Sequence, residues 1–359
     1  GISGLEGVIT LKLTATDSAG NWASDTMTVN WDKKAPEPPK MEFGFGQAWS
    51  WSWDNSSKRL RCMDHSSTNT GWISGAFTGI IKTTDGWKTY SHLSTSLSNF
   101  DVYCIDFYDS NNGVAAGNGF VAYTTDGGVN WIVRDFPFCP KKIKYISSSK
   151  FVCISGTKFI ASSDGGLSYY FLHDTGNANL YLNDFYYESD AFYILVGDNG
   201  YTCYKKTYSD VNFINTCQPL RNVSYVGGKT FIGEYNGDLW RTATNWEFQS
   251  NWSKIDISVS PMSVIFPDSN IGFIINGTSY PTFYRSSDGG NSFVSLPVNS
   301  NLPNTSTYSF PYVYNYRNAY CIITSVSTTY KSYMFAYRTI DNGKSANYPI
   351  VVDFVPSSG

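Results

Sequence analysis

The stretch TTDGGVNW at residues 124–131 contains the first group that could do chemistry, the carboxylate of Asp126. In this setting an aspartate could be a catalytic group, a metal ligand or part of a turn. The same pattern returns at four further aspartates: Asp85, Asp164, Asp288 and Asp341. A catalytic centre needs groups that converge on one point, and regularly spaced copies do not converge. We therefore expect these aspartates to be structural, each accepting backbone N–H bonds within its own turn while the glycines adopt positive φ.

Two other carboxylates, Asp184 and Glu234, are candidates for a weaker alternative, glycoside hydrolysis. That reaction needs two acidic groups about 5–10 Å apart. Asp101 and Asp198 are expected near the same end of the molecule. Nothing in the sequence pairs these groups, and carboxylates are common in turns, so no catalytic residue is predicted as the main interpretation.

Aromatic side chains are the better candidates for binding, because rings beside amide groups suit contacts with sugars or proteins. The candidate binding residues are Tyr181, Tyr186, Tyr235, Tyr312 and Tyr314. The competing interpretation is packing, since 17% of the chain is aromatic and tyrosines are to be expected everywhere.

Composition excludes several function classes. The net charge is −3 and no basic stripe occurs, which argues against nucleic-acid binding. No apolar run approaches the roughly 20 residues of a membrane span. Seven cysteines and three histidines lie at spacings that fit no zinc site. We expect neither a metal nor a cofactor.

The elements that position these residues follow from a repeat. An apolar run, a turn, a second apolar run and a glycine recur at 59–77, 102–119, 143–157, 182–200, 221–237, 262–278 and 312–326. Units of this kind at about 40–45 residues are typical of propeller blades of four strands, here A to D. The sequence therefore predicts an all-β fold, a seven-bladed β-propeller over 43–359, with each aspartate turn joining strands C and D. The alternating stretch 46–54 and the run 348–354 are expected to complete the last blade.

Residues 1–32 differ from the repeat. The run 8–32 alternates apolar and polar residues around a turn cluster at 17–21, which predicts a β-hairpin, and a Pro-rich linker follows at 33–42. The hairpin resembles the C-terminal part of a bacterial or archaeal extracellular immunoglobulin-like repeat. That resemblance implies a partial sandwich module within a larger surface protein. The alternative is that the hairpin completes a sheet in a neighbouring subunit.

Two covalent features are also predicted. Cys203 and Cys217 flank an expected turn near residue 210, so they would be cross-strand partners able to form a disulfide. Candidate N-glycosylation sites occur at Asn55, Asn222, Asn251, Asn276 and Asn304.

The repeated turn resembles the Asp-box of sialidases, sortilin-type receptors, xyloglucan-cleaving glycosidases and photosystem II assembly-factor propellers. The lead-in Ile105-Asp106-Phe107 is most similar to the assembly-factor pattern. Sialidases use an arginine triad, and the sialidase first-blade motif is absent. Only Arg59, Arg61 and Arg221 could face the end opposite the Asp-boxes, which argues against that enzyme class.

We therefore expect a non-catalytic extracellular or cell-surface adhesion module that presents a propeller face for protein or glycan binding. The expected partners are a protein or glycan ligand at the face opposite the Asp-boxes and neighbouring immunoglobulin-like modules or subunits. A glycoside hydrolase or polysaccharide-binding propeller is the alternative.

Overall fold

The structure is a computed structural model, and it forms two units, Gly1–Gly46 and Gln47–Gly359. It describes residues 7–16, 22–31, 50–52, 59–87, 89–93, 95–206, 209–211, 218–242, 252–257, 261–276, 282–296, 307–315, 318–325, 331–338 and 350–353.

The first unit contains an antiparallel hairpin of β1 (Gly7–Thr16) and β2 (Trp22–Trp31). Its register places Ile9 opposite Val29 and Leu11 opposite Met27. The immunoglobulin-like nature of this hairpin stays a prediction.

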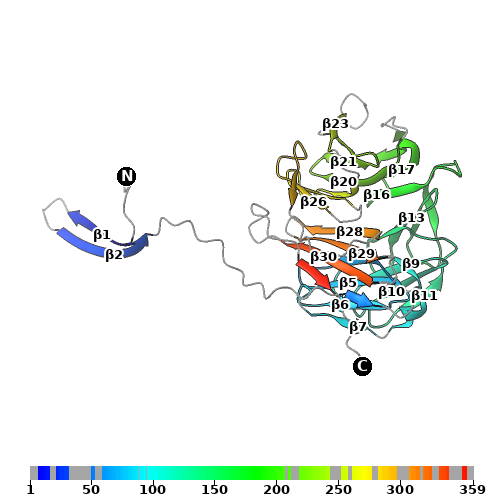
Figure 1. Cartoon of the computed structure of the whole chain (residues 1–359), viewed down its shortest axis with the longest axis horizontal. Coiled ribbons are helices and arrows are strands. Elements are labelled where there is room, and N and C mark those ends of the chain that lie inside the picture. The colour runs from blue at the N-terminus through cyan, green and yellow to red at the C-terminus, as the bar shows by residue number, and fades with distance from the viewer. Residues whose placement is uncertain are drawn as a thin grey trace. The chain divides into compact units, whose positions relative to one another are not determined.

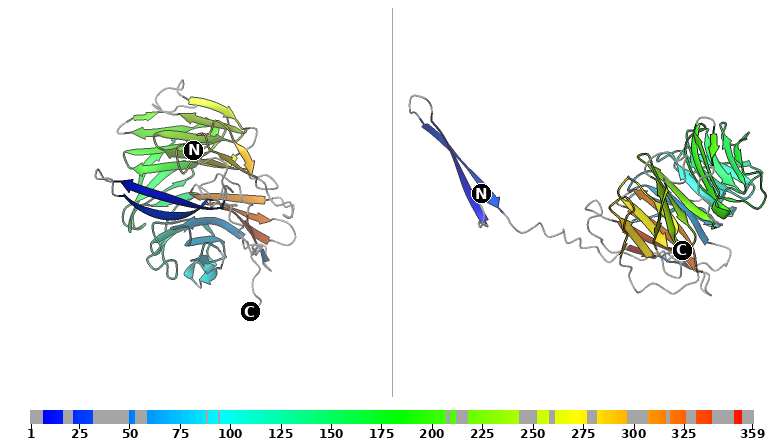
Figure 2. Two further views of the ribbon diagram at one scale, coloured as in Figure 1. Left: turned by 90° about the vertical axis from the view of Figure 1, so that its left-hand side faces the viewer. Right: turned by 90° about the horizontal axis from the view of Figure 1, so that it is seen from above.

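The second unit is an all-β propeller, as predicted. Six four-stranded antiparallel sheets follow one another in chain order around it (Figures 1 and 2). The first three sheets consist of β4 (Arg59–His65), β5 (Gly71–Ala76), β6 (Ile80–Thr83) and β7 (Ser91–Leu93); β8 (Val102–Phe107), β9 (Gly113–Gly117), β10 (Phe120–Thr124) and β11 (Ile132–Asp135); and β12 (Lys142–Tyr145), β13 (Phe151–Ser155), β14 (Lys158–Ser162) and β15 (Tyr170–Asp174).

The next three sheets have the same arrangement. They consist of β16 (Leu182–Ser189), β17 (Phe192–Gly197), β18 (Thr202–Lys206) and β19 (Ser209–Val211); β20 (Leu220–Val226), β21 (Lys229–Glu234), β22 (Asp238–Thr242) and β23 (Trp252–Asp256); and β24 (Pro261–Ile265), β25 (Gly272–Asn276), β26 (Thr282–Ser286) and β27 (Val294–Leu296). Two short 3₁₀ turns, η1 (Ser96–Asn99) and η2 (Asp198–Gly200), lie in connections.

A further sheet lies where the last predicted blade belongs. It contains β28 (Thr307–Asn315), β29 (Asn318–Ser325) and β30 (Lys331–Arg338). Both β3 (Ser50–Ser52) and β31 (Ile350–Asp353) pair with β30, which confirms that segments from both ends of the repeat complete this sheet. Strand β28 contacts β24 on one side and β4 on the other.

The apolar core lies between adjacent sheets, where aromatic rings from neighbouring blades stack. Trp72 stacks on Phe107 with ring centroids 3.5 Å apart, and Phe231 stacks on Phe266 at the same distance. Phe107 and Phe266 follow the same repeat pattern in different blades, so the periodic aromatic residues of the sequence are the residues that join the blades.

The Asp-box turns connect the third and fourth strands of their blades, as predicted. In the turn of Asp126, the carboxylate accepts the backbone N–H groups of Val129 (3.0 Å) and Asn130 (2.9 Å). The Thr124 hydroxyl accepts the N–H of Gly128 at 3.0 Å, and Gly128 has a φ of 92°. Asp341 lies outside the described residues.

Each of three Asp-box turns is also held by a cation from the preceding blade. The carbonyl of the first turn glycine accepts a hydrogen bond in each case: Gly127 from Lys82 (3.1 Å), Gly165 from Arg134 (2.9 Å) and Gly289 from Arg241 (2.8 Å). The turns therefore join blades as well as closing their own hairpins.

The hairpin that motivated the disulfide has a different register from the one predicted. Tyr204 pairs with Val211 and Lys206 with Ser209, so the turn lies between Lys206 and Ser209 and not near residue 210. Cys203 is buried with Sγ 3.7 Å from His173 Nδ1. Cys217 lies outside the described residues, and no disulfide joins the cysteines that are described. The bridge stays a prediction, and it fails if both thiols react with an alkylating reagent in the native protein.

Candidate functional site

The blade topology separates two ends of the propeller. In each antiparallel blade the A–B turn and the Asp-box lie at one end, and the B–C turn and the link to the next blade lie at the other. We call this second end the far face. The inner strands β4, β8, β12, β16, β20 and β24 begin there, and most successive inner strands contact each other around the axis.

A β-bulge recurs where the inner strands begin. The register shifts between Leu60 and Cys62, between Val102 and Cys104, between Leu182 and Asp184, and between Leu220 and Asn222. Just before β12, Lys141 donates its backbone N–H to the carbonyl of Ile154, the residue that pairs with Lys142. One side chain per blade is therefore set at this position, and we call these side chains the bulge residues: Arg61, Tyr103, Lys141, Asn183 and Arg221. Bulges are over-represented next to active sites because they re-aim side chains.

Arg61 begins the set in the first blade. Its Nη2 donates to Asp101 Oδ2 at 3.0 Å, and its guanidinium lies 4.6 Å from the centre of the Tyr103 ring. The backbone of Asp101 lies close against Gly117, because a Cβ on Gly117 would be only 2.2 Å from the Asp101 carbonyl oxygen. The link between the first two blades is therefore held against a bulge residue.

Lys141 and Asn183 continue the set in the third and fourth blades. Lys141 Nζ donates to Asn183 Oδ1 at 2.8 Å, while Asn183 Nδ2 donates to Asp198 Oδ1 (2.9 Å) and to the Leu220 carbonyl (3.0 Å). Partial desolvation lowers the pKa of Lys141, and the carboxylates of Asp184 and Asp198 oppose that shift. Polar groups of three blades are thus connected.

Arg221 completes the set in the fifth blade. Its guanidinium lies 4.3 Å from the centre of the Tyr235 ring, a cation–π geometry. Tyr235 follows β21 and is 47% exposed, and its N–H donates to the Pro219 carbonyl at 2.9 Å. Arg221 Nε is buried and has no hydrogen-bond partner among the described residues.

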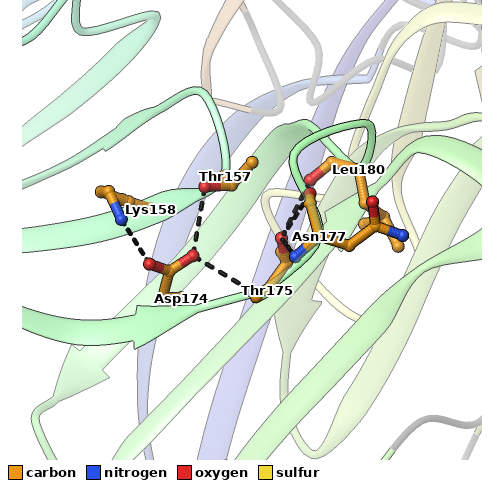
Figure 3. A network of polar contacts seen from close by, with 7 residues as sticks. Thr157, Lys158, Asp174, Thr175, Asn177 and Leu180 are labelled. Atoms are coloured by element: carbon orange, nitrogen blue, oxygen red, sulfur yellow. Dashed lines mark hydrogen bonds and ion pairs between the residues drawn. The ribbon is translucent and has the colours of Figure 1, made fainter.

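A polar network orders the far-face loop before β16 (Figure 3). Asp174 accepts from the Thr157 hydroxyl (3.1 Å) and forms an ion pair with Lys158, and the Thr175 hydroxyl donates to Asn177 and Leu180 carbonyls. This loop leads to Tyr181, which is 54% exposed and whose carbonyl accepts the N–H of Asp198 at 3.0 Å. Two of the predicted binding tyrosines, Tyr181 and Tyr235, therefore lie exposed at the far face.

Tyr186, another of the predicted binding tyrosines, does not lie exposed at the far face. Tyr186 is half-buried between the fourth and fifth blades, where it packs on Tyr225 with ring centroids 4.9 Å apart. Its hydroxyl donates to Glu188, and burial together with that carboxylate raises the pKa of Tyr186 to about 12. The side chains of Tyr312 and Tyr314, on β28, lie outside the described residues.

The two candidate catalytic carboxylates are both engaged by the fold. Asp184 accepts the backbone N–H of Val223 in the next blade at 3.0 Å and forms an ion pair with Lys142. Glu234 is 1% exposed and accepts the Trp240 indole N–H at 2.7 Å. Both carboxylates therefore have hydrogen-bond partners within the fold.

One candidate glycosylation site is described in full. Asn222 lies inside β20 next to the bulge, and its side chain is half-buried, which leaves little room for a glycan. The side chain of Asn276 lies outside the described residues, as do Asn55, Asn251 and Asn304.

The sequence indicated Arg61 and Arg221 only as candidates for a sialidase-type arginine triad, and it gave no indication of Lys141 and Asn183. Their shared signal is the residue two positions before the apolar residue that begins the lead-in, for example Tyr103 before Ile105. The residue type at this position differs from blade to blade, so the repeat in the sequence does not show it. Only the bulge in the structure identifies it.

No described helix is long and apolar enough to cross a membrane. Among the same residues, no group of three His, Cys, Asp or Glu side chains is arranged to hold a metal ion.

Solved structures show the same fold at low sequence identity. YCF48 bound to D1 peptide matches with a TM-score of 0.61 and 15% identity, over 82% of this chain and 98% of that one. Virginiamycin B lyase from Staphylococcus aureus matches with a TM-score of 0.60 and 12% identity, over 81% and 98%. The GH74 xyloglucanase from Xanthomonas campestris matches with 0.59 and 10%, over 84% of this chain and 55% of that chain. No protein-family model and no curated protein matches the sequence. The chain is thus similar in fold to propellers with very different ligands.

Proposed function

We propose that this chain is a non-catalytic binding module whose ligand, a protein or a glycan, contacts the far face around the inner strands. The observation that carries the proposal is the repeated bulge, which sets one polar or aromatic side chain per blade at equivalent positions in five blades. Exposed Tyr181 and Tyr235 flank that set. Rigid aromatic rings beside adaptable polar groups are typical of recognition surfaces.

We further infer that the sheet of β28, β29 and β30 makes the seventh blade, and that the hairpin of β1 and β2 belongs to an immunoglobulin-like module. Together these features support a role outside the cell, as part of a modular surface protein used in adhesion. Peptide binding has a precedent in fold, since YCF48 was solved with D1 peptide.

The alternative, a glycoside hydrolase or polysaccharide-binding propeller, is supported by the fold similarity to a xyloglucanase. Its catalytic version is weakened by the contacts of Asp184 and Glu234, which already serve Val223, Lys142 and Trp240. A non-catalytic polysaccharide-binding propeller would use the same far face, so it is one form of the function that we propose.

The test is a screen of the whole chain against arrays of glycans and peptides, with Tyr235→Ala and a control, Tyr108→Ala. Tyr108 is 64% exposed in the A–B turn of the second blade, at the Asp-box end. We expect Tyr235→Ala to weaken binding about 5- to 30-fold, as for a central aromatic contact, and the control to bind normally. Equal loss in both variants would contradict a far-face site.

A fluorogenic-glycoside screen tests the alternative. We expect no turnover by the wild-type chain. Hydrolysis that disappears in a folded Glu234→Gln variant, with its melting temperature measured alongside, would replace the adhesion proposal with a hydrolase.

A further inference from the structure

Arg221 differs from the other arginines whose contacts are described. Arg61 has Asp101 as an acceptor, Arg134 has the Asp164 and Gly165 carbonyls, and Arg241 has Gly289 and Asn291. Among the described residues Arg221 has only the Tyr235 ring, and its buried Nε lacks an acceptor, as does the Nε of Arg61. Arg221 is set apart by its Nη donors, which also have no acceptor among the described residues and could receive an incoming anion.

A second cation lies near Arg221. Lys141 Nζ donates to Asn183 Oδ1, and Asn183 Nδ2 donates to the carbonyl of Leu220, the residue before Arg221. Lys141 Nζ uses one of its three donors on Asn183. Two neighbouring cations with unused donors favour an anionic ligand, and the planar fork of a guanidinium matches a carboxylate.

The other groups around Arg221 favour a sugar over an extended peptide. Asp198 offers a carboxylate as an acceptor for hydroxyl groups, and the half-exposed Tyr235 ring offers a stacking surface. A peptide that added itself as a strand would need unpaired backbone groups. The nearby backbone is already paired: Leu220 O with Asn183, Tyr235 N with Pro219 O, and Asp198 N with Tyr181 O.

We propose that Arg221, Tyr235, Lys141 and Asp198 form a subsite for a hexuronic acid residue of an acidic polysaccharide. The carboxylate lies against Arg221 and Lys141, the hydroxyls reach Asp198, and the sugar ring packs on Tyr235. The inference rests on the proposed binding at the far face and specifies its ligand class.

Calorimetric titration of the whole chain with trigalacturonate, its methyl ester and a neutral galactose trisaccharide tests this subsite. We expect the wild type to bind trigalacturonate and to bind the two uncharged probes at least 10-fold more weakly. Arg221→Gln should weaken trigalacturonate binding about 10- to 100-fold, the range for a hydrogen bond to a charged group, and leave binding of the neutral probes unchanged. Arg221→Lys should recover only part of the loss, and Tyr108→Ala should match the wild type.

The outcomes separate the two proposals. Equal binding of trigalacturonate by wild type and a folded Arg221→Gln variant overturns the subsite. Far-face binding of a peptide or neutral glycan, with no binding of trigalacturonate, overturns the subsite and leaves the proposed function standing. Absence of any ligand sensitive to Tyr235→Ala overturns both.

Discussion

At the scale of single residues, two side chains of the Asp-box turn, a hydroxyl and a carboxylate, accept its backbone N–H groups. The hydroxyl that ends the third strand is buried, with Thr124 and Ser286 each 1% exposed, while the carboxylate two residues later faces solvent. The sequence drew attention to the aspartate because it is the more recognisable residue. The structure assigns the buried hydrogen bonds to the hydroxyl, whose acceptor role the pattern did not reveal.

Thr124→Val should therefore destabilise the protein more than Asp126→Ala. Valine keeps the shape but leaves the buried Gly128 N–H without its acceptor, at a cost of about 1–3 kcal/mol. The exposed Asp126 contacts are screened by water, so Asp126→Ala should cost about 1 kcal/mol or less. Denaturant titration measures both, with Thr125→Val at the exposed neighbouring position as the control. A larger loss in Asp126→Ala would refute this division of roles.

Asp-box carboxylates also predict how stability changes in acid. The hydroxyl of Ser168 lowers the pKa of Asp164 to about 2, and that of Ser292 does the same for Asp288. Because the folded pKa lies below the unfolded value of 3.8, the contribution is present above pH 4 and lost as the pH falls from about 4 to about 2. Denaturation at several pH values should show a shallower acid slope in Ser168→Ala; an unchanged slope would contradict this cause.

At the scale of elements, side chains at one position of the inner strands connect several blades to the next. Asp106 accepts the Tyr145 N–H at 2.7 Å, Ser224 accepts the Phe266 N–H at 3.0 Å, and Lys144 donates to the Tyr187 carbonyl at 3.1 Å. The residue types differ from blade to blade while the geometry is kept. Sequence comparison between the repeats could not find this connection, because donor and acceptor exchange roles.

Asp106 makes one of these connections depend on pH. Burial raises the pKa of Asp106 to about 6, against the Tyr145 hydrogen bond and the charges of Lys144 and Lys142. The folded state then holds the proton more tightly than the unfolded state, so this group lowers stability as the pH rises from about 4 to about 6.

Asp106→Asn should abolish that slope and keep an oxygen for the Tyr145 N–H. Unfolding midpoints measured from pH 4 to pH 7 test this, with Asp109→Asn, a half-buried turn aspartate whose pKa is lowered, as the control. A slope that persists in Asp106→Asn would assign it to another group.

At the scale of the whole molecule, sequence period was enough to predict the propeller and the C–D location of the Asp-boxes. Period fails where neighbouring blades use different residues for one role, as Arg61, Tyr103 and Asn183 do. It also fails where a local register decides the geometry, as in the hairpin after Cys203, whose turn begins after Lys206. The repeat predicts the packing between blades. The side chains that we propose for ligand binding lie at a position where the blades differ in residue type.

Closure of the propeller predicts a strong effect far from any ligand. Strand β3 joins the last sheet through Trp51, which pairs with Ser332. Trp51→Pro disrupts this three-residue pairing and should lower the unfolding free energy by about 1–3 kcal/mol, while ligand affinity stays unchanged. Trp51→Ala is the matched control for the side chain, and equal stability of the proline and alanine variants would show that the pairing contributes nothing.

The pairing of β3 and β31 with the same strand, β30, has a consequence for synthesis and folding. Residues 50–52 leave the ribosome long before their partner at 331–333. Contacts between residues so far apart in the sequence form slowly, and an unpaired strand edge promotes aggregation until its partner strand has been made. Early blades can pack in succession, but the first of these strands stays without its sheet until the last sheet of the propeller has been made. A holding chaperone during that interval should raise the yield of folded protein more than any single stabilising substitution within the early blades.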